Sequence, residues 1–517
     1  MAACGGEPQD AGSLLHRGNG VEPESLDMHR SRSVEAGNVQ RDLGEGLVGY
    51  DRHGALVPAA AERWEISDDA LEYRFYLRPD LRWSNGDALT AEDFVYSFRR
   101  LMAPETAAIY AQSLSDIVNA SSIIAGRMPP DTLGVEAGSE RELLIRLERP
   151  VPYFLGLLTH QNSFPVHRGS VEAHGDRHAQ PGNLVSNGPY RLVRWDLGAF
   201  IEIERNEFYW DDANTPIDRV RYHVTPEPMV ELNRYRAGEL HVTSTIPPGA
   251  FAQMRAERPD EIHVSPGLGV HYYGFNLTKP LFRDNPPLRE ALSLAVDREA
   301  ITRQVIGRGE QPAYSWVPPG VDGYEPSELP FAGMSQAARN ARAKQLYAEA
   351  GYGPDNPLRF TLRYNTSDTQ KAMAAAIQSM WQTALGAEVS LINEEFQVHL
   401  QNVRAMQKTE MFRLSWFGEY NDAHSFLKIF RSDDPSNLVA YRSEDFDGLM
   451  RQAAEQLDPD RRSLFLGEAE ATLLNDHALI PIYFHINKSM VSPAVDGWED
   501  NVLNYHYSRH LRLDADP

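Results

Sequence analysis

The chain has 517 residues, of which 42% are hydrophobic, and at ~150 residues per domain it can form a large core shared by two to four lobes. Its 73 acidic and 50 basic side chains give a net charge of -23, which opposes binding to nucleic acid or anionic lipid and favours neutral or cationic partners. No apolar run approaches the ~18 residues that cross a bilayer. The single cysteine, Cys4, excludes an intramolecular disulfide and an all-cysteine metal site.

The first residues, Met1-Ala-Ala-Cys-Gly-Gly6, have two interpretations. Small residues before a cysteine resemble the end of a bacterial lipoprotein signal, in which Cys4 would carry a lipid anchor. The hydrophobic segment that should come before them is missing, so a disordered polar tail fits about as well. We expect the residues before about Arg17 and after about Leu513 to form loose tails.

Gly44-Glu-Gly-Leu-Val-Gly49 matches the G-x-G-x-x-G pattern of dinucleotide-binding loops. The glycines of such a loop must follow a strand and open a helix. Here the preceding residues, Asn38 to Leu43, are polar and predict a helix that ends at a glycine. The context argues against a cofactor loop, and we expect no cofactor.

The segment from Leu71 to Leu147 predicts one α+β lobe. Alternating runs at Leu71–Leu77 and Glu142–Leu147 are typical of half-buried strands. Between them, Thr90-Ala-Glu-Asp93 has the sequence of a capping box and predicts the start of a helix.

Residues 188 to 224 contain three further strand-like runs, at 188–194, 200–204 and 219–224. We expect the first two to form a hairpin. After Gly269 the pattern changes toward alternating strands and helices, and the chain as a whole is predicted to be α/β with mixed α+β lobes.

The clearest βαβ unit comprises a strand at Leu358–Tyr364, a helix at Thr369–Leu385 and a strand at Ala387–Asn393. Asn365-Thr-Ser-Asp368 lies between the first strand and the helix, where open α/β sheets bind ligands. Its backbone amides could receive an anion. The alternative, which these four residues alone favour, is that they only cap the helix.

The run from Arg413 to Phe426 places a guanidinium and the carboxylate of Glu419 six residues apart, at either end of an aromatic-rich stretch. Charges removed from water are costly unless something pairs with them. They therefore pair within the chain or await a charged ligand.

Motifs for catalysis are few. The pairs His174/His178 and His506/His510 have helical spacing but no glutamate at the position that zinc proteases require, so we expect no metal site. We also find no P-loop, nucleophile elbow or zinc ribbon. The sequence predicts that the protein is not an enzyme.

Several segments together resemble the bacterial extracellular solute-binding proteins of family 5, which serve peptide ABC transporters. The similarity extends in order from about Asn19 to the end of the chain. The segments that carry it are Arg82–Tyr96, Ser186–Tyr190, Glu204–Trp210, Asn233–Glu239, Pro287–Arg298 and Trp416–Leu427.

The resemblance implies a three-lobed periplasmic-binding-protein fold of class II, cluster C, in which two lobes close by a hinge over a ligand cleft. Hinges are expected near residues 270 and 487. Lobe I would comprise residues 1–44, 169–270 and 487–517, lobe II residues 45–168, and lobe III residues 271–486.

The resemblance also implies a set of ligand-binding residues. Arginines at positions 404 and 413 match those that bind peptide C-termini, and Glu419 matches the aspartate that holds the peptide α-ammonium. The full set is Val34, Tyr110, Tyr272, Asn365, Gln370, Phe396, Arg404, Arg413, Trp416, Glu419, Tyr483 and His485.

Three of these positions depart from the family pattern. Gln370 replaces a histidine, Phe396 replaces a tryptophan, and Glu419 is one methylene longer than the family aspartate. The implied function is capture of short oligopeptides in the periplasm, by a monomer, for the membrane permease of an ABC importer. Alternatives are another solute on the same scaffold (murein tripeptide, a dipeptide or an opine-like compound), a secreted peptidase, or a structural surface protein.

Overall fold

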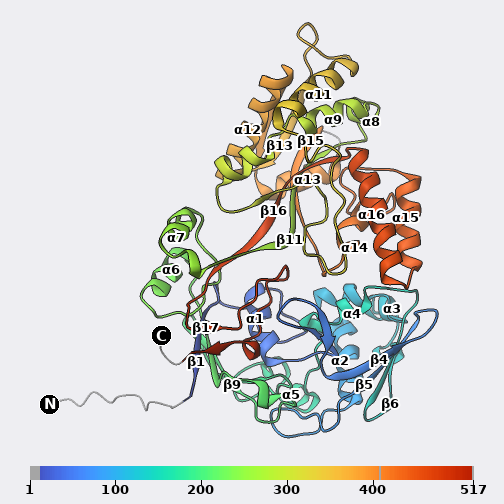
Figure 1. The fold of residues 1–517 in the computed structure, drawn as a ribbon. Helices are drawn as coiled ribbons and strands as arrows, with labels where there is room; N and C mark the ends of the chain where they lie inside the picture. The colour runs from blue at the N-terminus through green and yellow to red at the C-terminus, as the bar shows by residue number, and fades with distance from the viewer. Residues whose placement is uncertain (1–11, 407–408, 515–517) are drawn as a thin grey trace, which may run out of the picture. The chain divides into compact units, whose positions relative to one another are not determined.

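The computed structural model describes residues 12–406 and 409–514 (Figure 1). Cys4 and its proposed lipid anchor lie outside them. The chain divides into two compact units. Unit 1 contains the residues up to His263, Lys488–Asp500 and the segment from Tyr505, and unit 2 contains Val264–Asn487 and Asn501–Asn504. The finer division into three lobes and the hinge positions stay predictions.

One four-stranded sheet of unit 1 has the order β1-β10-β9-β8. Strands β8 (Tyr190–Asp196) and β9 (Phe200–Arg205) form the predicted antiparallel hairpin, and β10 (Arg219–His223) continues the sheet. The side chains of Ile201, Ile203 and Val220 are fully buried in the core beneath it.

The predicted N-terminal tail overlaps a strand. Strand β1 (Leu14–Gly18) pairs in parallel with β10, and Leu15 is fully buried. The prediction of a loose tail up to Arg17 is therefore wrong from Leu14 onward. Five residues carry too little alternation to signal a strand when their partner lies about two hundred residues away.

The second sheet of unit 1 has the order β4-β5-β7-β6 and contains the strands predicted near residues 71 and 142. Helix α2 (Ala91–Met102) packs against two of them and begins at the predicted capping box, in which Thr90 and Asp93 satisfy each other's backbone amides. The strands are β4 (Ala61–Ile66), β5 (Glu72–Leu77), β6 (Val135–Ser139) and β7 (Glu142–Arg146).

The G-x-G-x-x-G segment does not form a dinucleotide loop. Helix α1 (Val34–Leu43) ends at Gly44, as expected, and the glycines lead into the short strand β2 (Val48–Tyr50). The other elements of unit 1 are β3 (Leu56–Pro58), α3 (Ala120–Ile124), α4 (Phe154–Leu157), α5 (Arg168–His174), α6 (Pro228–Arg236), α7 (Phe251–Glu257), β17 (Val495–Asp496) and β18 (Arg512–Leu513).

Unit 2 is built on one mixed six-stranded sheet with the order β12-β16-β11-β15-β13-β14. The chain enters unit 2 within β11 and leaves it within β16, its two longest strands (Figure 1), and returns briefly to unit 2 at Asn501–Asn504. The strands are β11 (Ile262–Phe275), β12 (Gln311–Pro312), β13 (Arg359–Asn365), β14 (Glu388–Glu394), β15 (Met411–Phe417) and β16 (Leu479–Met490).

The predicted βαβ unit is confirmed, because β13 and β14 are parallel and helix α12 (Asp368–Leu385) connects them. Fully buried Trp316 and Trp381 belong to the core of unit 2. Its remaining helices are α8 (Pro280–Arg283), α9 (Pro286–Leu294), α10 (Arg298–Ala300), α11 (Gln336–Glu349), α13 (Phe396–Ala405), α14 (His424–Leu427), α15 (Glu444–Glu455) and α16 (Pro459–Asn475). Across the described part of the chain, helices fall short of the length and apolarity that crossing a membrane requires.

Candidate functional site

Strand β15 places its side chains alternately on the two faces of the unit 2 sheet. Its antiparallel register with β11 sets Tyr273 opposite Arg413 and His271 opposite Ser415. These four side chains therefore share one face. Tyr272 and Trp416 belong to the other face. They were predicted to bind the ligand together with Arg413, but the alternation of side chains along the strands places them on the opposite side of the sheet from it.

Arg413 is a mostly buried cation with neutral neighbours. Its Nη1 donates to Asn365 Oδ1 at 2.7 Å, and its Nη2 lies 3.4 Å from both Ser415 Oγ and His271 Nδ1. Its buried Nε has no hydrogen-bond partner among the described residues. Burial lowers the pKa of the guanidinium from its usual value.

No ion pair of Arg413 is found within residues 12–406 and 409–514. Arg363 differs from Arg413 in this respect, because its buried guanidinium pairs with the carboxylate of Glu394. A buried charge without a counter-charge is costly, and a ligand carboxylate would relieve that cost.

Asn365 lies at the end of β13, at the predicted position before α12. Its side chain accepts from Arg413, so the structure brings these two predicted residues together. Ser367 occupies the N-cap position of α12 by its backbone but makes no side-chain capping bond. The Asn365 amide therefore orients the arginine, while capping by Ser367 is limited to its backbone.

The side chains of Tyr483 and His485, both on β16, lie on the same face of the sheet as Arg413. The Tyr483 ring stacks on His271 with centroids 4.6 Å apart, and His485 Nε2 lies 3.1 Å from Ser415 Oγ. Sequence reasoning did not find His271, Tyr273 or Ser415. The alternation of side chains along a strand could have placed Ser415 on the same face as Arg413. His271 and Tyr273 could not be found in this way, because their position opposite these residues depends on the register between the strands.

Trp416 and Glu419 are held together by the turn that follows β15. Trp416 Nε1 donates to the Ser425 carbonyl at 2.9 Å, and the Glu419 backbone amide donates to Ser425 Oγ at 2.7 Å. The carboxylate of Glu419 pairs with Lys428 Nζ at 2.5 Å, and its side chain is 55% exposed. Glu419 thus has an internal cationic partner.

Four other predicted residues of unit 2 lie apart from this group. Tyr272 is in the core, edge-on to Trp316 at 5.0 Å. Gln370 is buried in α12, and its Oε1 has no partner among the described residues. Phe396 begins α13 and is exposed, and Arg404 is exposed in the last turn of the same helix.

The two predicted residues of unit 1 are Val34 and Tyr110. Val34 begins α1 and is 72% exposed, while Ser33 caps that helix by accepting from the Ala36 amide. The Tyr110 ring lies 4.9 Å from the His160 ring. The roles of both residues in binding stay predictions from the resemblance.

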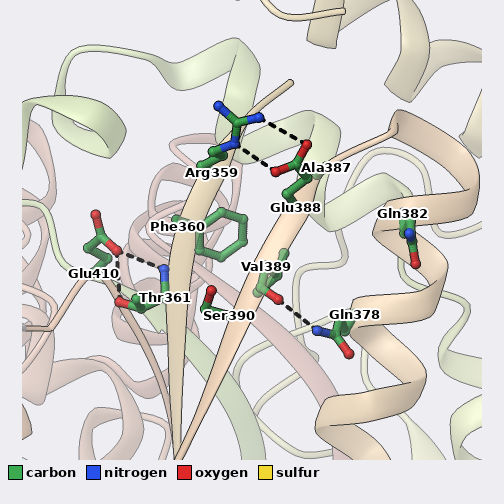
Figure 2. A pocket seen from close by; sticks show the side chains of 10 residues that line it. All are labelled: Arg359, Phe360, Thr361, Gln378, Gln382, Ala387, Glu388, Val389, Ser390 and Glu410. Carbon is green, nitrogen blue, oxygen red and sulfur yellow. Dashed lines mark hydrogen bonds and ion pairs between the residues drawn. The ribbon is translucent and has the colours of Figure 1, made fainter. Parts of the chain in front are cut away.

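A cavity of about 440 Å³ opens at the other end of β13 and β14 (Figure 2). Figure 2 shows the Arg359–Glu388 ion pair between the two strands and Glu410 bonded to Thr361. Ligands of open α/β sheets bind at the carboxyl ends of strands, whereas this cavity lies at the amino ends. It contains none of the predicted site residues; it is lined by Arg359, Phe360, Thr361, Gln378, Gln382, Ala387, Glu388, Val389, Ser390 and Glu410.

Comparison with known proteins agrees with this architecture. The family model of bacterial extracellular solute-binding proteins, family 5 (middle), matches residues 55–437. The periplasmic oligopeptide-binding protein OppA of Salmonella typhimurium is 41% identical over 487 residues, which cover 94% of this chain and 89% of that protein.

Two solved structures are similar over almost the whole chain. The unliganded open form of MppA, a periplasmic murein tripeptide binding protein, gives a TM-score of 0.93 at 34% identity and 98% coverage of both chains. Haemophilus influenzae OppA in complex with the peptide RPPGFSPFR gives 0.72 at 35% identity, covering 98% of this chain and 99% of that chain. These relatives are binding proteins and not enzymes. The predicted class II periplasmic-binding fold is therefore confirmed, and the chain belongs to the bacterial extracellular solute-binding proteins of family 5.

Proposed function

We propose that this protein captures short oligopeptides in the periplasm and delivers them to the permease of a peptide ABC importer. Family membership and a peptide-bound relative of the same fold support this proposal. The observation that carries it is Arg413, a mostly buried guanidinium that faces only neutral partners in the described chain.

The peptide carboxylate would pair with Arg413. Asn365 holds Nη1 of the guanidinium, while the buried Nε has no protein acceptor among the described residues. A charge-assisted bond to a carboxylate would supply the missing counter-charge in a site sheltered from salt. Tyr483 and His485 would form the wall beside it, and Arg404 is a second candidate for binding the peptide carboxylate.

The peptide α-ammonium would pair with Glu419. The carboxylate already contacts Lys428 at 2.5 Å, so an incoming ammonium must share it or replace the lysine. Because Glu419 is half-exposed, solvent screens the pair and exchange costs little. Backbone hydrogen bonds along an extended peptide would add affinity that does not depend on sequence.

The proposal is tested by calorimetry with Ala-Ala-Ala and its C-terminal amide at pH 7. The amide lacks the carboxylate and would leave Arg413 unpaired, so we expect at least a tenfold higher dissociation constant. Arg413→Lys should weaken tri-alanine binding similarly, because an ammonium cannot reproduce the guanidinium geometry. Equal binding of acid and amide would contradict the carboxylate assignment.

A second solute on the same scaffold remains the alternative within this class. This chain is similar to MppA, and Gln370, Phe396 and Glu419 differ from the family pattern. Murein tripeptide, dipeptides and opine-like compounds are therefore the alternative candidate ligands. A thermal-shift panel of these solutes separates them, since the true ligand stabilises the folded state most. Recovery of intact peptide after long incubation would dismiss a peptidase, and ligand-induced stabilisation would dismiss a purely structural role.

A further inference from the structure

Helix α13 places a fully buried histidine against the backbone of the binding arginine. His399 Nε2 lies 2.8 Å from the carbonyl oxygen of Arg413. A carbonyl oxygen can only accept a hydrogen bond, so His399 Nε2 must carry the hydrogen. The contact therefore fixes the tautomer of the neutral ring, in which Nδ1 has no hydrogen and can only accept.

The other ring nitrogen of His399 faces a carboxylate. His399 Nδ1 lies 3.6 Å from Glu394 Oε2, and within residues 12–406 and 409–514 neither of these two buried atoms has a hydrogen-bond partner. The second oxygen of the carboxylate, Oε1, accepts from Arg363 Nη1 and Asn402 Nδ2. Two buried acceptors thus lie side by side with no hydrogen between them, which is a costly arrangement.

A proton on His399 Nδ1 would remove this cost. The ring would then donate both to the Arg413 carbonyl and, after the two groups approach by less than about 1 Å, to Glu394 Oε2. The bond would also be charge-assisted, because it joins an imidazolium to a carboxylate. A bridging water that donates to both atoms would satisfy them too, but without a change of charge. Only the proton makes the site sensitive to pH.

The charges around His399 oppose one another. Burial is the largest effect and lowers the pKa of the ring, Glu394 raises it, and the positive charge of Arg413 lowers it again, so the ring is neutral at pH 7 in the absence of ligand. The charged groups on the surrounding elements are Arg363 on β13, Glu394 on β14, Arg413 on β15, and Glu395 and Arg404 on α13 itself. Of these, Arg413 is the one whose charge a ligand carboxylate would offset.

We propose that His399 is a positioning residue for Arg413, and that the Glu394–His399 pair takes up a proton when a ligand carboxylate binds this arginine. This inference rests on the proposed function. In the free protein the charge of Arg413 opposes a second positive charge on the ring. A bound carboxylate offsets the first charge, so His399 Nδ1 takes a proton from solvent and donates to Glu394. Binding then tightens as the pH falls, because ligand and proton favour each other reciprocally.

Titration calorimetry with Ala-Ala-Ala at pH 7.0 and 5.5, in two buffers of different ionisation enthalpy, measures both the affinity and the proton uptake. We expect about fivefold tighter binding at pH 5.5 and net uptake of protons on binding. His399→Gln keeps an N–H donor for the Arg413 carbonyl but cannot be protonated, so it should remove both effects. His174→Gln, at an exposed histidine of unit 1, is the matched control and should retain both.

Nitrogen-15 NMR of the histidine side chains gives a second readout, with the His399 signals assigned by their loss in His399→Gln. At pH 7 without peptide, the ring should show a protonated Nε2 and an unprotonated Nδ1. Saturating tri-alanine at pH 5.5 should move Nδ1 to the imidazolium range. A bridging water predicts the neutral pattern with and without peptide at both pH values, and that result would overturn the proposal.

The outcomes distinguish this inference from the function on which it rests. Binding of tri-alanine without proton uptake, or with equal uptake in His399→Gln, would overturn the proton linkage alone. Failure of tri-alanine to bind at either pH would overturn the proposed function and this inference with it. If His399→Gln does not fold, Glu394→Gln takes its place, because its amide can donate to Nδ1 without a proton, and it should abolish the uptake.

Discussion

Glu419 and Arg413 differ in what the protein already provides for their charges. Glu419 is half-exposed and paired with Lys428, whereas Arg413 is mostly buried among neutral acceptors. A ligand that binds Arg413 supplies a missing counter-charge, but a ligand that binds Glu419 competes with a lysine. The C-terminal contact should therefore contribute more to affinity than the N-terminal one.

Removing the competitor should strengthen peptide binding. We expect Lys428→Met to lower the dissociation constant of Ala-Ala-Ala by about twofold to fivefold, because the ammonium then meets an unpaired carboxylate. Glu419→Ala should raise it about tenfold, and N-acetylation of the peptide should do the same in the wild type. Calorimetry measures all three, with N-acetyl-tri-alanine as the control, on which Lys428→Met should have little effect. Weaker binding of the free peptide to Lys428→Met would contradict the role of Glu419.

At the scale of elements, the sequence predicted the strands and helices that carry their own periodicity. The hairpin of β8 and β9, the capped helix α2 and the β13-α12-β14 unit all follow from local alternation or capping residues. Strand β1 was missed because its only evidence is its pairing with distant β10. Ser415 and His271 were missed for a related reason, since their contact requires the register between β11 and β15.

A single buried carboxylate holds the loop after β12 to helix α16. Glu470 is fully buried and accepts from the backbone amides of Trp316, Val317 and Ser327 at 2.7 to 2.8 Å and from the Tyr324 hydroxyl at 2.6 Å. Burial raises its pKa to about 7, and these donors oppose the shift. The contact is long-range, so the sequence does not show it.

Replacing this acceptor should destabilise unit 2. In Glu470→Gln, an amide NH₂ replaces one carboxylate oxygen, and this group cannot accept hydrogen bonds from the backbone amides that it faces. At pH 8 we therefore expect the free energy of unfolding to fall by about 2 to 4 kcal/mol. Urea denaturation followed by tryptophan fluorescence measures the change. Glu468→Gln, at an exposed position of the same helix, is the matched control and should change it by less than ~0.5 kcal/mol. Equal stability of the two variants would show that the loop does not depend on the carboxylate.

At the scale of the whole molecule, composition predicts a large hydrophobic core but does not predict which histidines are buried in it. The sequence contains 17 histidines, and the residue type alone does not reveal which of them fold into the interior. In the structure, burial lowers the pKa of His29 to about 3 and that of His16 to about 4 in unit 1. In unit 2 it lowers the pKa of His477 to about 4. Acid sensitivity is therefore built into both units.

The sign of the resulting pH dependence follows from these shifts. A histidine in the unfolded chain has a pKa near 6.5, so below that pH it binds a proton. The same histidine stays unprotonated when it is buried in the folded protein, so the unfolded state binds more protons than the folded state. Each such histidine lowers the free energy of unfolding by up to ~1.4 kcal/mol per pH unit, from about pH 6.5 down to its folded pKa. We expect the melting temperature, measured by scanning calorimetry without ligand, to be steady from pH 8 to 7 and to fall steadily between pH 6.5 and 4.5. His29→Gln should reduce this slope, while exposed His174→Gln should not. A melting temperature that stays constant down to pH 4.5 would show that the buried rings are protonated at little cost.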